Sequence, residues 1–111
     1  MSNQCNIGFT VDGITFLSKR KADRYCELKQ LERRGKIADI SVEHRFVLQP
    51  YFKKNGKIIT AITFIADFTY YNLERMRNVV EIVKGDMTEA DEIKRRMFEY
   101  KYPEIAVKEV E

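Results

Sequence analysis

The 111 residues suit one domain, and an apolar share of 44% with seven Phe and six Tyr excludes a fully disordered chain. The net charge of +3 does not by itself indicate a nucleic-acid partner. No apolar run approaches the roughly 18–20 residues of a membrane span, and the start of the chain lacks the basic-then-apolar order of a signal peptide. We therefore expect a single cytosolic domain over residues 1–111, with residues 1–8 loosely ordered.

The first part of the chain predicts a tight turn followed by a helix. Asp12-Gly13 interrupts the apolar stretch 9–16, which favours two short extended pieces joined by a turn. Ser18 offers an N-cap for a helix over 19–34, which contains neither Pro nor Gly, and Gly35 stands where a helix commonly ends. The expected apolar stripe of this helix consists of Ala22, Tyr25, Leu28 and Leu31.

The middle of the chain predicts an antiparallel meander. Residues 37–48 alternate apolar and polar side chains, which is typical of a strand. Asn55-Gly56 is a strong hairpin signal, and the return strand over 58–71 is the most β-like segment. Its alternation predicts one buried face, comprising Ile58, Ile62, Phe64, Ala66, Phe68 and Tyr70. The apolar run 79–84 supplies the third strand.

The last part of the chain predicts a capped helix and one more strand. Thr88 and Asp91 have the spacing of a capping box for a helix over 89–101, which Pro103 stops. Residues 105–107 then form a short strand, parallel to a neighbour through a right-handed crossover. The expected apolar stripe of this helix consists of Ile93, Met97 and Tyr100, with Phe98 beside it. The fold class is thus α+β (α/β-like), an αβββαβ order with a mixed sheet flanked by helices.

Two charged residues stand near the ends of strongly apolar, neighbouring strands. Asp67 is the only charge in 58–71, and Lys84 closes the run VVEIVK. Because a lone buried charge is costly, each needs a partner or a solvent-facing cleft. One interpretation is structural, either an Asp67–Lys84 ion pair or two strand ends that reach water. The other is a metal-dependent phosphodiesterase centre, in which carboxylates hold Mg²⁺ and a lysine stabilises charge.

Several segments, in order along residues 12 to about 107, resemble the small phage-encoded proteins of the DUF1064 family. The resemblance implies a PD-(D/E)XK nuclease-like fold, similar to restriction endonucleases, in a single nuclease-like domain within the host cytosol. The matching segments are DGITFLSK (12–19), GKI (35–37), LQP (48–50) with Phe52, IADF (65–68), VEIVKG (80–85), Thr88 and KRRMFEYKY (94–102).

The family's functional residues carry over unevenly. Its first-helix motif places a glutamate three residues after a serine, but Lys21 follows Ser18 at that spacing. The aspartate of the long strand matches Asp67, and the strand lysine matches Lys84. The acid expected two residues before that lysine is replaced by Ile82. Two of the three acids are therefore missing, which leaves open whether the protein is an enzyme.

Neighbouring acids offer uncertain substitutes. Glu81 lies three residues before Lys84, so a regular strand points it to the opposite face, whereas a β-bulge would bring both to one side. The direction of Glu43 relative to Asp67 is open. Lys21 adds positive charge where a divalent cation would sit, which predicts poor Mg²⁺ binding.

Three functions follow from the resemblance. The first is nucleic-acid binding, chiefly to DNA, with weakened or lost catalysis; Lys21, Lys84, Lys94 and Arg95 would contact phosphates without metal. Asp67 would then be a structural partner of Lys84 or Lys21.

The second function is an active endonuclease or Holliday-junction-type resolvase that uses Mg²⁺ or Mn²⁺. Asp67 and Glu81 would be the metal ligands, and Lys84 would be the electrostatic catalyst. The third is a catalytically dead fold reused as a protein-binding inhibitor or adaptor of a host factor. A homodimer is a further expectation for this fold, and no membrane partner is expected.

Overall fold

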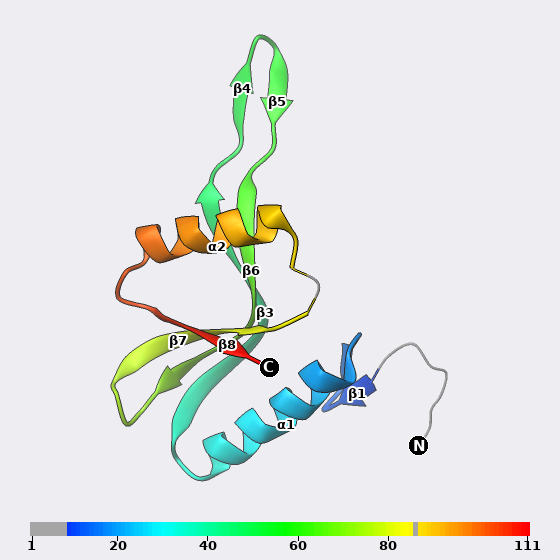
Figure 1. The fold of residues 1–111 in the computed structure, drawn as a ribbon, viewed down its shortest axis with the longest axis vertical. Helices are drawn as coiled ribbons and strands as arrows, with labels where there is room; N and C mark the ends of the chain where they lie inside the picture. The colour runs from blue at the N-terminus through cyan, green and yellow to red at the C-terminus, as the bar shows by residue number, and fades with distance from the viewer. Residues whose placement is uncertain (1–8, 86) are drawn as a thin grey trace.

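The centre of the fold is a four-stranded mixed sheet with the strand order β3-β6-β7-β8 (Figure 1). The computed structural model describes residues 9–85 and 87–111, so the expectation for residues 1–8 lies outside the described residues. The strands are β3 (Ile37–Gln49), β6 (Ile62–Asn72), β7 (Arg77–Val83) and β8 (Ala106–Val110). The first three pair antiparallel and β8 pairs parallel to β7, which confirms the expected meander and crossover.

A small hairpin of β1 (Phe9–Val11) and β2 (Ile14–Phe16) precedes the first helix. Its turn residues Asp12 and Gly13 both have positive φ, at 52° and 77°. Two consecutive left-handed residues match the twist of the flanking strands, which is why Asp-Gly was predictive here. Phe16 then packs its ring 5.4 Å from that of Tyr25, so the hairpin closes one end of the core.

Helix α1 (Lys19–Arg33) begins and ends where the sequence predicts, within one residue. The Ser18 hydroxyl accepts hydrogen bonds from the backbone N–H groups of Arg20 and Lys21. At the other end Gly35 adopts a φ of 75°, which turns the chain so that the N–H of Lys36 reaches the carbonyl of Leu31. The helix covers the cluster that also contains Phe68, Tyr70, Val79 and Val83.

Helix α2 (Glu89–Lys101) has the predicted capping box between Thr88 and Asp91. Phe98 is its fully buried residue, and its ring lies 4.7 Å from those of both Phe46 and Phe64. The prediction of a buried stripe was wrong, because α2 buries Phe98 against the sheet in place of the stripe. The stripe faces outward, with exposed fractions of 43% for Ile93, 38% for Met97 and 90% for Tyr100.

The two helices pack against opposite sides of β7. Val79 and Val83 belong to the cluster under α1, whereas Val80 and Ile82 belong to the cluster that contains Phe98. This strict alternation shows that no bulge interrupts β7 before its end. No helix in the described parts of the chain is long and apolar enough to cross a membrane.

A second hairpin, β4 (Phe52–Lys54) and β5 (Lys57–Ile59), projects beyond α2 (Figure 1). Asn55 and Gly56 form its turn with φ values of 52° and 75°. The predicted strand over 58–71 is therefore split between β5 and β6. Its predicted inward face fails at Ile58, which is 62% exposed, because no layer formed by the described residues covers the hairpin.

Candidate functional site

A cleft of about 530 Å³ lies between the N-terminal ends of α1 and α2 and the adjoining segments of β6 and β7. It brings together four of the residues that the sequence singled out, which are Lys21, Asp67, Lys84 and Lys94. Ile82 lines it as well, at the position where the family resemblance expected an acid. Segments distant in the sequence thus meet in one place, as an αβββαβ order would require.

The central contact of the cleft is an ion pair between Lys21 and Asp67. The Lys21 Nζ lies 3.0 Å from Asp67 Oδ1, and the two side chains are 36% and 15% exposed. Asp67 Oδ2 accepts a hydrogen bond of 2.7 Å from the backbone N–H of Val83. The paired register of β6 and β7 begins only at Phe68 and Glu81, so the Asp67 carboxylate satisfies an N–H that has no strand partner there.

Lys84 does not pair with Asp67, so of the two partners that the sequence offered for Asp67, Lys21 is confirmed and Lys84 is wrong. Lys84 follows the end of β7, and among residues 9–85 and 87–111 the carboxylate that its Nζ reaches is that of Glu111, at 3.8 Å. Lys21 takes the partner position because α1 begins beside the cleft. Arg20 holds the helix there by donating a hydrogen bond of 2.8 Å to the backbone carbonyl of Lys84.

Two acids that the sequence could not place also line the cleft. Glu43 stands opposite Asp67 in the register, between the pairs Val42–Phe68 and His44–Ala66, and has a φ of 50°. Asp91 belongs to the capping box of α2. Its hydrogen bonds from Thr88 lower the pKa of Asp91 below its ordinary value. The capping pattern predicted that Asp91 lies in the first turn of a helix, but it gave no indication of a nearby cleft.

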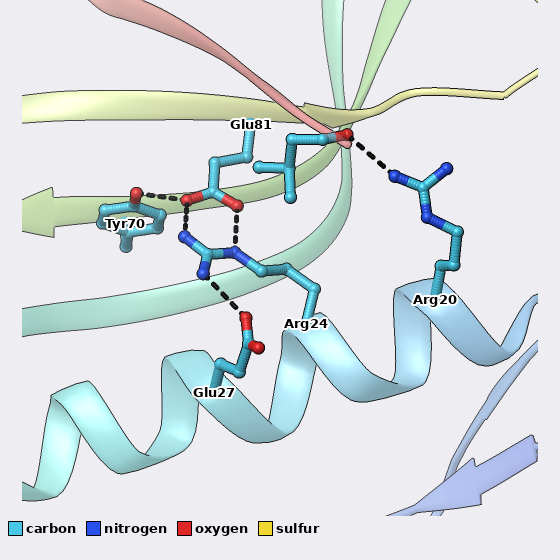
Figure 2. Close-up of polar contacts among 6 residues, drawn as sticks. Arg20, Arg24, Glu27, Tyr70 and Glu81 are labelled. Atoms are coloured by element: carbon cyan, nitrogen blue, oxygen red, sulfur yellow. Dashed lines mark hydrogen bonds and ion pairs between the residues drawn. The ribbon is translucent and has the colours of Figure 1, made fainter.

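Glu81 lies on the opposite face of β7 and is completely buried. Figure 2 shows its carboxylate held by the guanidinium of Arg24, with Nε 2.8 Å from Oε1 and Nη2 2.6 Å from Oε2. The Tyr70 hydroxyl donates a further hydrogen bond to Oε2. Glu27 accepts from the remaining nitrogen, Nη1, at 2.9 Å. The regular strand therefore turns Glu81 away from Asp67.

This network shifts the pKa values of Arg24 and Tyr70, the two residues that bind Glu81. The hydrogen bonds to Glu81 raise the pKa of Arg24 above its ordinary value, against the opposing effect of burial. Burial is the largest cause that raises the pKa of Tyr70, and the hydrogen bond to Glu81 adds to it. Both shifts favour a permanently charged Arg24 and a neutral Tyr70. The network joins α1 to the sheet and has no opening to the cleft.

The acids of the cleft do not fit a divalent-metal centre. Both oxygens of Asp67 are engaged, by Lys21 and by the Val83 N–H. Both oxygens of Glu81 are engaged on the other face of β7. In residues 9–85 and 87–111, no group of three or more His, Cys, Asp or Glu side chains is arranged to hold a metal ion. We therefore derive no catalytic step that passes through Mg²⁺ or Mn²⁺.

Arg95, which the sequence placed among the phosphate contacts, is not part of the cleft. Its guanidinium binds the carboxylate of Glu109 on β8, and the Arg95 side chain is only 20% exposed. Neighbouring positions on a helix point about 100° apart, so Lys94 lines the cleft while Arg95 faces the sheet edge. The contact of Arg95 joins α2 to β8.

The fold and the site define a small α+β domain with a charged cleft where its two helices begin. The chain belongs to the family described as "Protein of unknown function (DUF1064)", whose model matches residues 4–110. This match confirms the DUF1064 resemblance. No curated protein and no solved structure matches the chain.

Proposed function

We propose that the protein binds nucleic acid through this cleft, on a PD-(D/E)XK nuclease-like fold that is similar to restriction endonucleases and has lost metal-dependent catalysis. The element order α1, β3, β6, β7, α2, β8 supports the fold, because it is the αβββαβ order that the resemblance implies. The two hairpins are additions to that core. DNA is the expected ligand class.

The observation that carries the proposal is the ammonium of Lys21 beside Asp67. In a metal-dependent centre, carboxylates gather around a divalent cation that contacts phosphate. Here Lys21 stands at the position of one expected acid and lies 3.0 Å from the remaining one. Ile82 replaces the other. The Lys21 side chain thus supplies permanent positive charge, so the cleft can bind a phosphate without a bound metal.

Lys84 and Lys94 are the groups that we expect to contact phosphate. Asp67 is already neutralised by Lys21, and Asp91 is held in the first turn of α2. Lys84 is 48% exposed, and its distant contact to the 89% exposed Glu111 is of a kind that contributes little. A phosphate can therefore displace Glu111. The N-terminal ends of two helices also border the cleft, which favours an anion there.

A salt series with fluorescently labelled DNA tests this proposal. Wild type should bind in buffer with a chelator, and affinity should fall steeply as salt rises. Lys84→Ala should weaken binding and reduce the slope of log affinity against log salt by roughly 0.7–0.9, the effect of one phosphate contact. Lys36→Ala is the control, because Lys36 is exposed at the far end of α1. Wild-type protein that fails to bind even at low salt would sink the proposal.

A cleavage assay tests the loss of catalysis separately. Linear, single-stranded and branched DNA incubated with Mn²⁺ should remain intact. Cleavage that Asp67→Ala abolishes would contradict this part of the proposal. Cleavage that survives the substitution would come from a contaminating nuclease.

A protein partner is the second candidate, and the outward stripe of α2 supports it. Ile93, Met97 and Tyr100 line a shallow cavity of about 520 Å³ whose rim carries Arg96 and Lys101. An apolar centre with a basic rim suits an acidic protein surface. A stoichiometric complex with a host protein that Met97→Ser abolishes would favour this reading, and retention by the variant would oppose it.

A further inference from the structure

The hairpin that projects beyond α2 is the feature of the molecule that the cleft does not explain. We call residues 51–60, which contain β4 and β5, the arm (Figure 1). All ten residues are exposed. Its apolar side chains include Tyr51 at 66%, Phe52 at 41%, Ile58 at 62% and Ile59 at 40% exposure. An isolated two-stranded hairpin is marginally stable in water, and exposed apolar groups of this extent mark an interaction surface. The arm therefore requires a partner.

Charge identifies the kind of partner. Residues 49–66 contain three lysines, Lys53, Lys54 and Lys57, and no Asp or Glu. In a second copy, the apolar cavity along α2 is rimmed by Arg96 and Lys101, and no carboxylate is among its lining residues. Docking the arm of one copy there would bring like charges together. An arm that is basic at its tip is instead complementary to a polyanion.

We propose that the arm enters the major groove of a B-form DNA duplex whose backbone lies along the cleft, an inference that rests on the proposed function. A major groove about 12 Å wide and 8.5 Å deep admits a two-stranded β-ribbon, whereas a minor groove about 6 Å wide does not. The arm extends three paired residues to its turn, a reach on the order of 10 Å, which matches the depth of the groove. Lysines at the tip contact phosphates, and apolar side chains contact thymine methyl groups.

The arm and the cleft are joined by one strand. Thr63 and Ile65 of β6 line the cleft, and β6 follows the arm after only Ala61. The chain from Thr63 to Gly56 spans at most about 25 Å when fully extended. One duplex can thus occupy the cleft and the arm together.

This assignment predicts which nucleic acid binds best. A single strand has no groove for the arm and should engage only the cleft. Double-stranded RNA is A-form, with a major groove too narrow for side chains to read. We therefore expect the affinity order duplex DNA, then single-stranded DNA and duplex RNA.

The test compares an arm variant with a cleft variant on three labelled probes. The arm variant is Lys53→Gln, Lys54→Gln, Lys57→Gln, and the cleft variant is Lys84→Ala. The probes are a duplex DNA of roughly 20 base pairs, about two helical turns, its single strand, and the matching duplex RNA. We expect the arm variant to lose about tenfold or more in duplex DNA affinity and two or three units of salt slope. Its affinity for the single strand should be unchanged, whereas Lys84→Ala should weaken binding to all three probes.

Each outcome bears on the proposal. Because the arm lysines are exposed, and their side chains form no hydrogen bond or ion pair within the described residues, the variant should fold normally, and circular dichroism checks this. A single Lys54→Glu variant provides a second test with the smallest change. Equal duplex binding by wild type and arm variant would overturn the arm proposal and leave the proposed function standing. Absence of wild-type binding to every probe would overturn both, and a sedimenting dimer that the arm variant dissociates would assign the arm to a second copy instead.

Discussion

Helix α1 forms two ion pairs with neighbouring strands, and the two pairs differ in almost every respect. Arg24 binds Glu81 through two hydrogen bonds inside the protein, where Glu81 has no exposed surface. Lys21, three residues earlier, binds Asp67 through one contact of 3.0 Å at the edge of a cleft. The first pair joins α1 to the sheet inside the protein, and the second lies where a ligand can reach it.

The difference follows from the chemistry of the two cations. A guanidinium presents a planar fork that matches a carboxylate and stays charged when buried. An ammonium is a compact point charge on a flexible stem, suited to a wet site where partners exchange. We infer that Arg24–Glu81 is structural and that Lys21–Asp67 is a remodelled functional centre. The following experiments challenge that division, from the largest expected effect to the smallest.

Removing Arg24 should cause the largest loss of stability. Arg24→Ala leaves the Glu81 carboxylate buried with only the Tyr70 hydroxyl as a partner. An uncompensated buried charge of this kind costs about 3–5 kcal/mol of unfolding free energy, which urea unfolding measures. The double variant Arg24→Met, Glu81→Leu should recover most of it, because apolar replacement of a buried pair is often neutral. A loss of unfolding free energy below about 1 kcal/mol in Arg24→Ala would contradict this prediction, because that is the contribution expected of an exposed ion pair.

Tyr70→Phe should cost about 1–3 kcal/mol at neutral pH, since it removes a hydrogen bond to a buried charged acceptor. The effect depends on pH because the folded state raises the pKa of Tyr70. The unfolded chain loses this proton near pH 10, before the folded protein does, so the Tyr70 contribution is complete below about pH 10 and declines above it. Chemical unfolding at a series of pH values should show that the difference in unfolding free energy between wild type and Tyr70→Phe shrinks above pH 10. A difference that grows with pH would contradict the assignment.

Restoring the missing acids should create a metal site in the cleft. Lys21→Glu, Ile82→Asp removes the ammonium beside Asp67 and adds two carboxylates to the cleft lining. Calorimetric titration with Mn²⁺ should show binding at least about tenfold tighter than wild type, equivalent to about 1.4 kcal/mol. Glu27→Gln in the same background serves as the control, because Glu27 is largely exposed on α1 and does not line the cleft. Equal Mn²⁺ affinity in wild type and the double variant would refute the remodelled centre.

Removing Lys21 should have the smallest effect on stability. Lys21→Ala leaves Asp67 partly exposed and still bound to the Val83 N–H. A half-exposed pair of this kind contributes up to about 1 kcal/mol, much less than the Arg24 pair. Thermal unfolding of Lys21→Ala and Arg24→Ala, measured under the same conditions, compares the two losses of stability. Equal destabilisation by both substitutions would remove the distinction between the two pairs.

The features that the sequence predicted well depend on short segments. The turns at Asp12-Gly13 and Asn55-Gly56 require positive φ, and the caps Ser18 and Thr88 bind backbone groups within one turn. Such signals need no knowledge of the rest of the chain. The alternation in β6 also predicted burial correctly from Phe64 onward, because the sheet is covered there.

The features that were missed depend on distant packing. The sequence placed Glu81 on the opposite face of its strand, but it gave no sign of burial or of a partner, because only the orientation of α1 brings Arg24 to it. The same orientation decides between Lys21 and Lys84, the two partners that the sequence left open for Asp67. Exposure of the arm and of the α2 stripe results from the absence of a covering layer in the described structure, which local periodicity does not report.

Binding of duplex DNA with and without metal tests the central claim most directly. Wild type should bind the labelled duplex with the same affinity in EDTA and in Mn²⁺ at constant ionic strength, and the affinity should fall steeply with salt. The Lys21 ammonium is part of the chain, so removing divalent ions should change nothing. Binding that requires Mn²⁺, or no binding at low salt, would contradict the account.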